Sequence, residues 1–182
     1  RNAEALETLE KVDTLVVDKT GTLTEGKPSV EAVQATEGFT EDEVLAIAAG
    51  IESVSEHPLA AAIVAEAQRR GVEFRPAEKF RAITGKGVIG VVGSRRVALG
   101  NAALLAQRDV DLRSLAEPAD VLRNGGSTVM FLAVDNRSAG LVAVSDPVKG
   151  TTPEALGQLK TDGMRVVMLT GDSRVTAGSV AR

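Results

Sequence analysis

Two short apolar runs lie near the ends of the chain, TLVVD at residues 14–18 and MRVVML at residues 164–169. Each ends in a polar turn that contains an aspartate, and short apolar runs bounded in this way are typical of buried strands in a parallel sheet. The segment TPEALGQLKTDG before the second run predicts a helix, with Pro153 near its start and Gly163 just past its end. Residues 1–12 predict the end of an amphipathic helix. Both ends of the chain therefore predict parallel βα units.

The pattern changes between these two ends. PSVEAV at residues 28–33 alternates as a half-exposed strand does. TEDEVLAIAAGIESV predicts a helix that begins after Thr40, with Glu43 completing a capping box. PLAAAIVAEAQRRG at residues 58–71 predicts a second helix, which has a proline in its first turn and Gly71 as its terminator.

Two β-hairpins and another helix are predicted in the rest of the middle. VVGSRRVAL places Gly-Ser between two β-like runs, and residues 127–146 form two apolar runs around Asp135-Asn136. Residues 112–124 predict a helix that Pro118 interrupts. The chain thus predicts one α/β domain in two segments, residues 1–26 and 145–182, separated by an antiparallel α+β insert over residues 27–144.

Composition narrows the classes of function. The 182 residues are 43% hydrophobic and 25% charged, as in ordinary globular proteins, and the net charge of −4 argues against a nucleic-acid partner. The absence of cysteine excludes disulfides, thiolate catalysis and cysteine-based metal sites. No run approaches the roughly 18 apolar residues that span a membrane, so we expect a soluble piece.

The two aspartate turns are the strongest candidates for chemistry. Asp18 and Asp172 both follow a predicted strand, and in open parallel sheets chemistry sits beyond the carboxyl ends of the strands. A carboxylate there can attack a phosphoryl group if Mg²⁺ or lysine offsets the negative charge. The hydroxyl and N–H groups of TGTLT and TGD suit phosphate oxygens. The structural alternative is that each aspartate only caps its turn.

These residues resemble a known family. DKTGTLT with the downstream TGD is similar to the phosphorylation domain of P-type ATPases, in the haloacid dehalogenase-like superfamily. GIESVSEHPLAAAI, AITGKGVIG and VALGN resemble the nucleotide-binding domain of the heavy-metal-transporting subgroup, most of all its copper(I) exporters. The resemblance implies a partial Rossmann-like phosphorylation domain with an inserted nucleotide-binding domain of antiparallel sheet flanked by helices.

The resemblance also implies roles for individual residues. Asp18 is expected to be the phosphorylated nucleophile, with Lys19 and Thr20 around the phosphate. Asp18 and the Thr20 carbonyl are expected to hold Mg²⁺. The phosphate-binding side is completed by Thr170, Gly171 and Asp172.

Thr20 separates an ATPase from a phosphatase on chemical grounds. Phosphatases of this superfamily carry a second aspartate two residues after the nucleophile, which acts as general acid and base. The hydroxyl of Thr20 cannot activate water in that way, so an aspartyl phosphate should persist.

The nucleotide candidates are weak when taken from the pattern alone. His57, the one histidine, precedes a predicted helix and would by itself be a structural or surface residue. Under the family resemblance, His57 stacks on or bonds adenine and Glu52 accepts a hydrogen bond from the exocyclic amine. ATP is then the expected ligand, held by contacts worth roughly 1 kcal/mol each.

GKGVIG at residues 85–90 fits the dinucleotide fingerprint literally, but a β-like run follows it where that fingerprint requires a helix. Gly85 and Gly87 either form a simple β-turn or let the backbone approach a nucleotide. Gly100 and Asn101 form a turn or helix cap by default, and lie beside the nucleotide in the family pattern. Lys86 can reach phosphate or remain solvated.

We expect, from this resemblance, the ATP-binding and phosphorylation region of a pump that exports a heavy-metal ion, with zinc or cadmium as the alternative cargo to copper(I). The expected partners are the actuator domain and transmembrane helices of the same pump, and the expected location is the cytoplasmic side of a membrane. The fragment, expected to be monomeric, should bind ATP without being catalytically complete. Two other functions stay open, a free-standing phosphatase and a non-catalytic nucleotide-sensing module.

Overall fold

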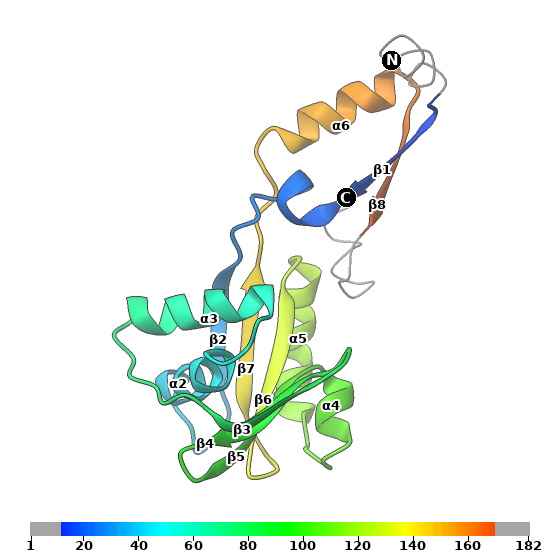
Figure 1. Ribbon diagram of the computed structural model, residues 1–182. Coiled ribbons are helices and arrows are strands. Elements are labelled where there is room, and N and C mark those ends of the chain that lie inside the picture. Colours follow the sequence, from blue (N-terminus) through cyan, green and yellow to red (C-terminus); the bar gives the residue numbers. More distant parts are fainter. Residues whose placement is uncertain (1–11, 170–182) are drawn as a thin grey trace. The chain divides into compact units, whose positions relative to one another are not determined.

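The computed structural model describes residues 12–169, which form two compact units (Figure 1). The first unit combines residues 12–27 with residues 146–169, and the second holds residues 28–145. The predicted helix over residues 1–12 and the TGD turn lie outside the described residues, save for Val12. None of the described helices is both long and apolar enough to cross a membrane.

The first unit is built on a pair of parallel strands. β1 (Thr14–Asp18) pairs with β8 (Arg165–Leu169), although more than 140 residues separate them, and Asp18 lies opposite Leu169. The wide turn η1 (Lys19–Leu23) follows β1, and helix α6 (Thr152–Thr161) precedes β8. The parallel βα pattern predicted for the two ends of the chain is therefore confirmed.

The expectation that both strands are fully buried was wrong. Exposure alternates along each strand, and Val16 and Leu169 are 60% and 64% exposed. The described sheet of this unit has two strands only, so one face keeps Leu15, Val17 and their partners half-buried while the other has no described element over it. The apolar runs thus predicted the two strands correctly, but the strands are less buried than the runs suggested.

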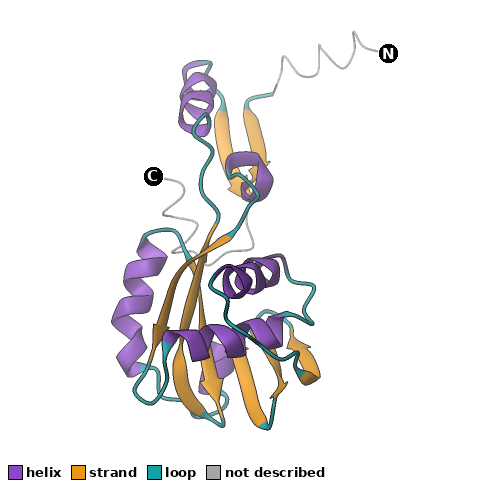
Figure 2. Ribbon diagram, turned by 90° about the vertical axis from the view of Figure 1, so that its left-hand side faces the viewer, coloured by secondary structure: helices purple, strands orange, loops and turns teal. Residues whose placement is uncertain are grey.

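The second unit is a six-stranded antiparallel sheet with helices on both faces (Figure 2). The strand order is β2-β7-β6-β5-β4-β3. The strands are β2 (Ser29–Ala35), β3 (Glu78–Ile83), β4 (Gly87–Val92), β5 (Arg95–Gly100), β6 (Thr128–Val134) and β7 (Arg137–Ser145). The helices are α2 (Glu41–Glu52), α3 (Pro58–Arg69), α4 (Ala102–Ala106) and α5 (Arg113–Asn124).

Two hydrophobic cores lie on opposite faces of this sheet. Alternate residues of β6 divide between them: Leu132 and Val134 pack with α2 and α3, whereas Phe131 and Ala133 pack with α4 and α5. Because both faces are covered, β6 needs apolar residues at successive positions, which is why its sequence is a continuous run. The predicted antiparallel insert is confirmed as a fold.

The helix boundaries follow local chemistry. Thr40 caps α2 with the predicted capping box, in which Glu43 bonds the Thr40 N–H at 2.8 Å. The β6–β7 hairpin turns at Asp135 and Asn136, both with positive φ, as a tight two-residue turn requires. The helix predicted over residues 112–124 is confirmed as α5, with Pro118 inside it, whereas α4 was not predicted.

Candidate functional site

Asp18 lies at the carboxyl end of β1 with an exposed side chain. The chain then turns through Lys19, which is 7% exposed, and Thr20, which is exposed and extended. Gly21 takes the left-handed conformation, with φ of 77°, which reverses the backbone at low cost only because glycine lacks a Cβ. The predicted nucleophile and two predicted neighbours therefore share one loop.

Thr24 holds this loop in shape. Its side chain is completely buried, and its hydroxyl oxygen accepts the Gly21 N–H at 3.1 Å. The hydroxyl lies 2.6 Å from Oδ2 of Asp146 and 3.1 Å from the Lys19 carbonyl, which already accepts the Thr24 N–H. A hydroxyl donates only one hydrogen, and the shorter contact to a carboxylate is the stronger acceptor. Thr24 thus joins the loop to Asp146.

The segment after β7 completes the support of the loop. Lys149 donates its Nζ hydrogen to the Gly21 carbonyl at 2.6 Å, and its N–H to the Leu23 carbonyl at 3.0 Å. Thr152, at the start of α6, donates its hydroxyl to the same Leu23 carbonyl at 2.8 Å. Lys149 and Thr152 thus satisfy two carbonyls of the loop that follows Asp18.

Sequence reasoning missed Thr24, Asp146, Lys149 and Thr152 as supporting residues. Their one signal was position: SDPVKG lies where the second apolar hairpin ends, and TEG lies where the first segment ends. A pairing across more than 120 residues has no local pattern that could reveal it.

The structure leaves the metal and the other phosphate contacts as predictions. Thr170, Gly171 and Asp172 lie outside the described residues. Within residues 12–169, no three carboxylate or imidazole groups gather closely enough to hold a metal ion. The carboxylate of Asp18 and the carbonyl of Thr20 are hard oxygen donors of the kind that Mg²⁺ prefers.

Glu52 and His57 lie together at the junction of α2 and α3. Glu52 ends α2 and is 5% exposed, and its Oε2 atom has no hydrogen-bond partner among the described residues. Burial raises the pKa of Glu52, while Ser55 and the nearby His57 partly oppose that rise. A buried carboxyl oxygen without a partner is unusual, and a ligand donor would relieve its cost.

His57 caps the N-terminus of α3 and is exposed. Its Nδ1 accepts the Leu59 N–H at 3.2 Å, which leaves the ring face and Nε2 available to a ligand. The cap fixes the tautomer, because an Nδ1 that accepts a hydrogen bond requires the hydrogen on Nε2 in the neutral ring. His57 can therefore offer an N–H donor and an aromatic face.

The glycine candidates and Asn101 form a separate group around one turn. Gly87 and Gly100 face each other across β4 and β5, and a Cβ on Gly100 would lie 2.2 Å from the Lys86 carbonyl. Asn101 donates Nδ2–H to the Gly85 carbonyl at 2.9 Å and caps α4 through Oδ1. Gly87 and Gly100 thus have a packing reason to be glycine, whereas Gly85 has φ of 69° and open space around it.

The structure therefore brings the candidates into three groups. The Asp18 loop is one, Glu52 with His57 is the second, and the Gly85 turn with Gly87, Gly100 and Asn101 is the third. Among the described residues, no hydrogen bond or ion pair joins the second group to the third. The strand that begins at Gly87 also confirms that GKGVIG is not a dinucleotide fingerprint.

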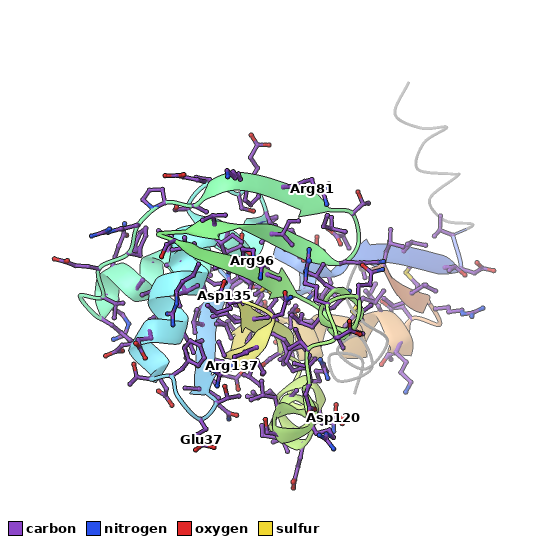
Figure 3. All side chains as sticks on the ribbon, turned by 90° about the horizontal axis from the view of Figure 1, so that it is seen from below. Glu37, Arg81, Arg96, Asp120, Asp135 and Arg137 are labelled. Atoms are coloured by element: carbon purple, nitrogen blue, oxygen red, sulfur yellow. The ribbon has the colours of Figure 1, made fainter. Side chains whose placement is uncertain are left out.

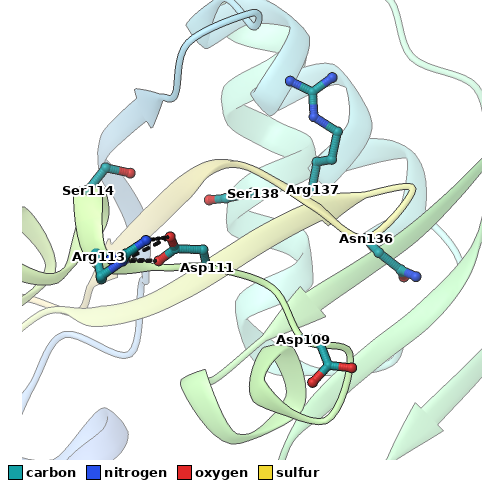
Figure 4. Close-up of a pocket in the computed structure, with 7 residues that line it drawn as sticks. All are labelled: Asp109, Asp111, Arg113, Ser114, Asn136, Arg137 and Ser138. Carbon is teal, nitrogen blue, oxygen red and sulfur yellow. Dashed lines mark hydrogen bonds and ion pairs between the residues drawn. The ribbon is translucent and has the colours of Figure 1, made fainter.

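A polar cavity of the second unit includes none of these candidates. It measures about 620 Å³ and is polar, with Arg113 paired to Asp111 on one side and Asn136 and Arg137 of the β6–β7 hairpin on the other (Figure 4). Size alone therefore does not identify the nucleotide site.

Comparison with known proteins defines the family. Residues 12–182 match the family model described as haloacid dehalogenase-like hydrolase, so the chain belongs to that family. Within it, the chain is similar to heavy-metal P-type ATPases. It is 52% identical over 181 residues to a copper-exporting P-type ATPase of Legionella pneumophila and 48% identical over 182 residues to a silver-exporting P-type ATPase of Salmonella typhimurium.

A solved structure agrees with these relatives. A zinc-transporting PIB-type ATPase in its E2.Pi state is 35% identical, with a TM-score of 0.70 over 97% of this chain and 28% of that one. All of this chain matches the two sequence relatives, yet it spans only 24% and 22% of their lengths. The fold expected from the resemblance is therefore confirmed.

Proposed function

We propose that this chain is the ATP-binding and phosphorylation region of a P-type ATPase that exports a heavy-metal ion, with copper(I) as the preferred cargo. The observation that carries this proposal is the DKTGTLT loop, which presents Asp18 at the end of a parallel strand. Thr24 stabilises this loop through hydrogen bonds with Gly21 and Asp146. The likeness to copper exporters supports the cargo. Zinc or cadmium remains the alternative, with a zinc-transporting structure similar to this chain, and the silver-exporting relative adds silver to the alternatives.

In the proposed reaction, a carboxylate oxygen of Asp18 attacks the γ-phosphorus of ATP and ADP leaves with the bond electrons. Lys19 and Thr20 contribute positive charge and hydrogen bonds to the phosphate oxygens, together with Thr170, Gly171 and Asp172. Mg²⁺, held by Asp18 and the Thr20 carbonyl, would offset the negative charge that builds between carboxylate and phosphate. Because Thr20 cannot act as acid or base, the aspartyl phosphate should outlast that of a phosphatase.

The second unit is the proposed nucleotide-binding domain. The unpartnered Oε2 of Glu52 can accept the exocyclic amine of adenine, and the His57 ring can stack on the base or donate to it. The exposed, left-handed Gly85 turn allows a close approach of the nucleotide to the backbone. We assign Gly87, Gly100 and Asn101 the supporting task of shaping that turn.

Titration with ATP tests the nucleotide half of this proposal. Each adenine contact is worth roughly 1 kcal/mol, so Glu52→Gln and His57→Ala should each weaken ATP binding by about fivefold. Glu56→Gln is the matched control, because Glu56 is exposed and lies between the two sites in sequence. Equal ATP affinity in all four proteins would contradict the assignment.

The two other functions predict different results. A free-standing phosphatase should hydrolyse p-nitrophenyl phosphate, and Thr20 argues against that activity. A non-catalytic nucleotide module should bind ATP without any phosphoryl transfer to Asp18. The phosphatase function is excluded if the chain does not hydrolyse p-nitrophenyl phosphate. The non-catalytic function is excluded if Asp18 becomes labelled in a complete pump.

A further inference from the structure

A second pocket, with a cationic rim, lies at the end of the six-stranded sheet where the β6–β7 hairpin turns. On the α4 and α5 face, the strand register aligns Arg81 with Ile89, Ile89 with Ala98, and Ala98 with Ala133. Cross-strand partners point to the same side of a sheet, so this row gives an apolar floor of Ile89, Ala98 and Ala133. The cavity above it measures about 260 Å³.

Three cations line this pocket: Lys79, Arg96 and Arg108. Lys79 reaches it through a bulge, because the register between β3 and β4 shifts between Glu78 and Arg81. Lys79 has φ of 51°, a left-handed conformation that costs a non-glycine residue free energy. Bulges of this kind re-aim side chains, and strained residues are concentrated at functional sites.

Arg108 supplies an independent observation. It follows α4, and its Nε atom is buried without a hydrogen-bond partner among the described residues. A buried guanidinium N–H that lacks an acceptor is costly, and an oxyanion is the acceptor that its planar fork fits best.

The acids near this pocket do not neutralise it. Asp135 accepts the Arg96 N–H, but its carboxylate lies 3.9 Å from Arg96 Nε, and the Arg96 side chain remains 73% exposed. Glu78 and Asp109 flank two of the cations in sequence and do not line the cavity. Figure 3 shows Arg96 next to Asp135, and Arg81 further along the outer strand β3.

We propose that this pocket binds the oxyanion of a small organic acid, a phosphate or a carboxylate carried on a short apolar body. The cations bind the oxyanion, with Arg108 Nε donating to it, and the body rests on Ile89 and Ala98. The volume fits a ligand much smaller than ATP. Glu52, His57 and the glycine candidates do not line this pocket, so it is distinct from the proposed nucleotide site.

The test is NMR titration of the ¹⁵N-labelled chain with phenyl phosphate, benzoate and inorganic phosphate in separate arms. The Nε–H resonance of Arg108 should shift downfield and saturate, because it gains an acceptor. Phenyl phosphate saturating at lower concentration than inorganic phosphate supports the apolar floor, and the comparison with benzoate separates phosphate from carboxylate. A linear, non-saturating response of Arg108 to all three probes overturns the proposal.

Variants separate this site from general attraction of anions. Arg108→Gln should weaken phenyl phosphate binding by about tenfold, since it removes a charged hydrogen bond. Lys79→Gly removes a cation while relieving the left-handed strain, so it should bind several-fold more weakly in a chain that melts at the same or a higher temperature. Lys160→Gln removes the same charge from the exposed surface of α6 and should leave the affinity unchanged. Equal affinity in Lys79→Gly and Lys160→Gln overturns the proposal even if Arg108→Gln fails to fold.

Discussion

The hydroxyl of Thr24 should be the main side-chain support of the Asp18 loop. Thr24→Val keeps the shape of the side chain but removes two hydrogen bonds, the one accepted from Gly21 and the one donated to the Asp146 carboxylate. The first is worth about 1 kcal/mol and the second, to a charged group, about 1.5 to 3 kcal/mol. The substitution should therefore destabilise the loop by about 2.5 to 4 kcal/mol.

Amide hydrogen exchange measures this effect locally. The N–H groups of Glu25 and Lys149 bond to the Pro147 and Leu23 carbonyls, and both report on the junction that Thr24 maintains. A loss of about 2.5 to 4 kcal/mol corresponds to a fall in their protection factors of about 70- to 900-fold, unless opening of the whole unit sets a lower limit.

A matched control lies two residues away. Thr22 belongs to the same loop but is exposed, so Thr22→Val should change protection by less than about 0.5 kcal/mol. Asp146→Asn should weaken the loop less than Thr24→Val, because its amide oxygen can still accept the hydroxyl. Equal protection factors in Thr24→Val and Thr22→Val would refute the support that we assign to Thr24.

Three further predictions concern the second unit. Burial raises the pKa of Glu52 above the usual 4.5, so the folded state holds a proton that the unfolded chain releases. The free energy of unfolding therefore falls as pH rises from 4.5 towards the folded pKa. Urea unfolding should show Glu52→Gln to be more stable than the parent at pH 7 but not at pH 4. The opposite sign applies to Glu66, where hydrogen bonds from Arg69 and then Arg70 lower the pKa to about 2. The stability that Glu66 contributes is present above pH 4.5 and lost towards pH 2, and it stays below about 1 kcal/mol because solvent screens the Arg69 side chain, which is 71% exposed. Acid titration of Glu66→Gln should therefore lack this step. Gly100→Ala should lower the free energy of unfolding by about 3 kcal/mol, because its Cβ would meet the Lys86 carbonyl at 2.2 Å. Gly85→Ala should cost only about 1 kcal/mol of backbone strain, because the space around Gly85 is open. Equal losses in thermal unfolding would contradict this packing argument.

Local signals in the sequence predicted most of the elements correctly. The capping box at Thr40, the Asp135-Asn136 turn and the glycine after α3 each act over a few residues, so a local pattern is enough to reveal them. The double-sided cover of β6 and the bare face of β1 and β8 depend on what packs above them. A sequence pattern does not contain that information, which is why the burial of Val16 was misjudged.

The candidate site also combines local features, which the sequence reveals, with long-range contacts, which it does not. The DKTGTLT segment is contiguous, so Asp18 was placed at a strand end from the sequence alone. The contact of Thr24 with Asp146 joins positions 122 residues apart, and no periodicity connects them. Gly87 and Gly100 have a packing reason to be glycine that the motif did not reveal, because their two backbones lie close together across β4 and β5, and their place beside a nucleotide stays a prediction.

The proposed function depends above all on phosphoryl transfer to Asp18. The direct measurement replaces the matching segment of the Legionella pneumophila copper-exporting ATPase with this chain, and incubates the hybrid pump with Mg²⁺ and ATP labelled at the γ-phosphate. We predict an acid-stable, hydroxylamine-sensitive label that disappears in Asp18→Asn, while Asp13→Asn keeps it, since Asp13 is exposed and precedes β1. A label of equal strength in the Asp18→Asn hybrid, or a parent hybrid that binds ATP but takes no label, would contradict the claim.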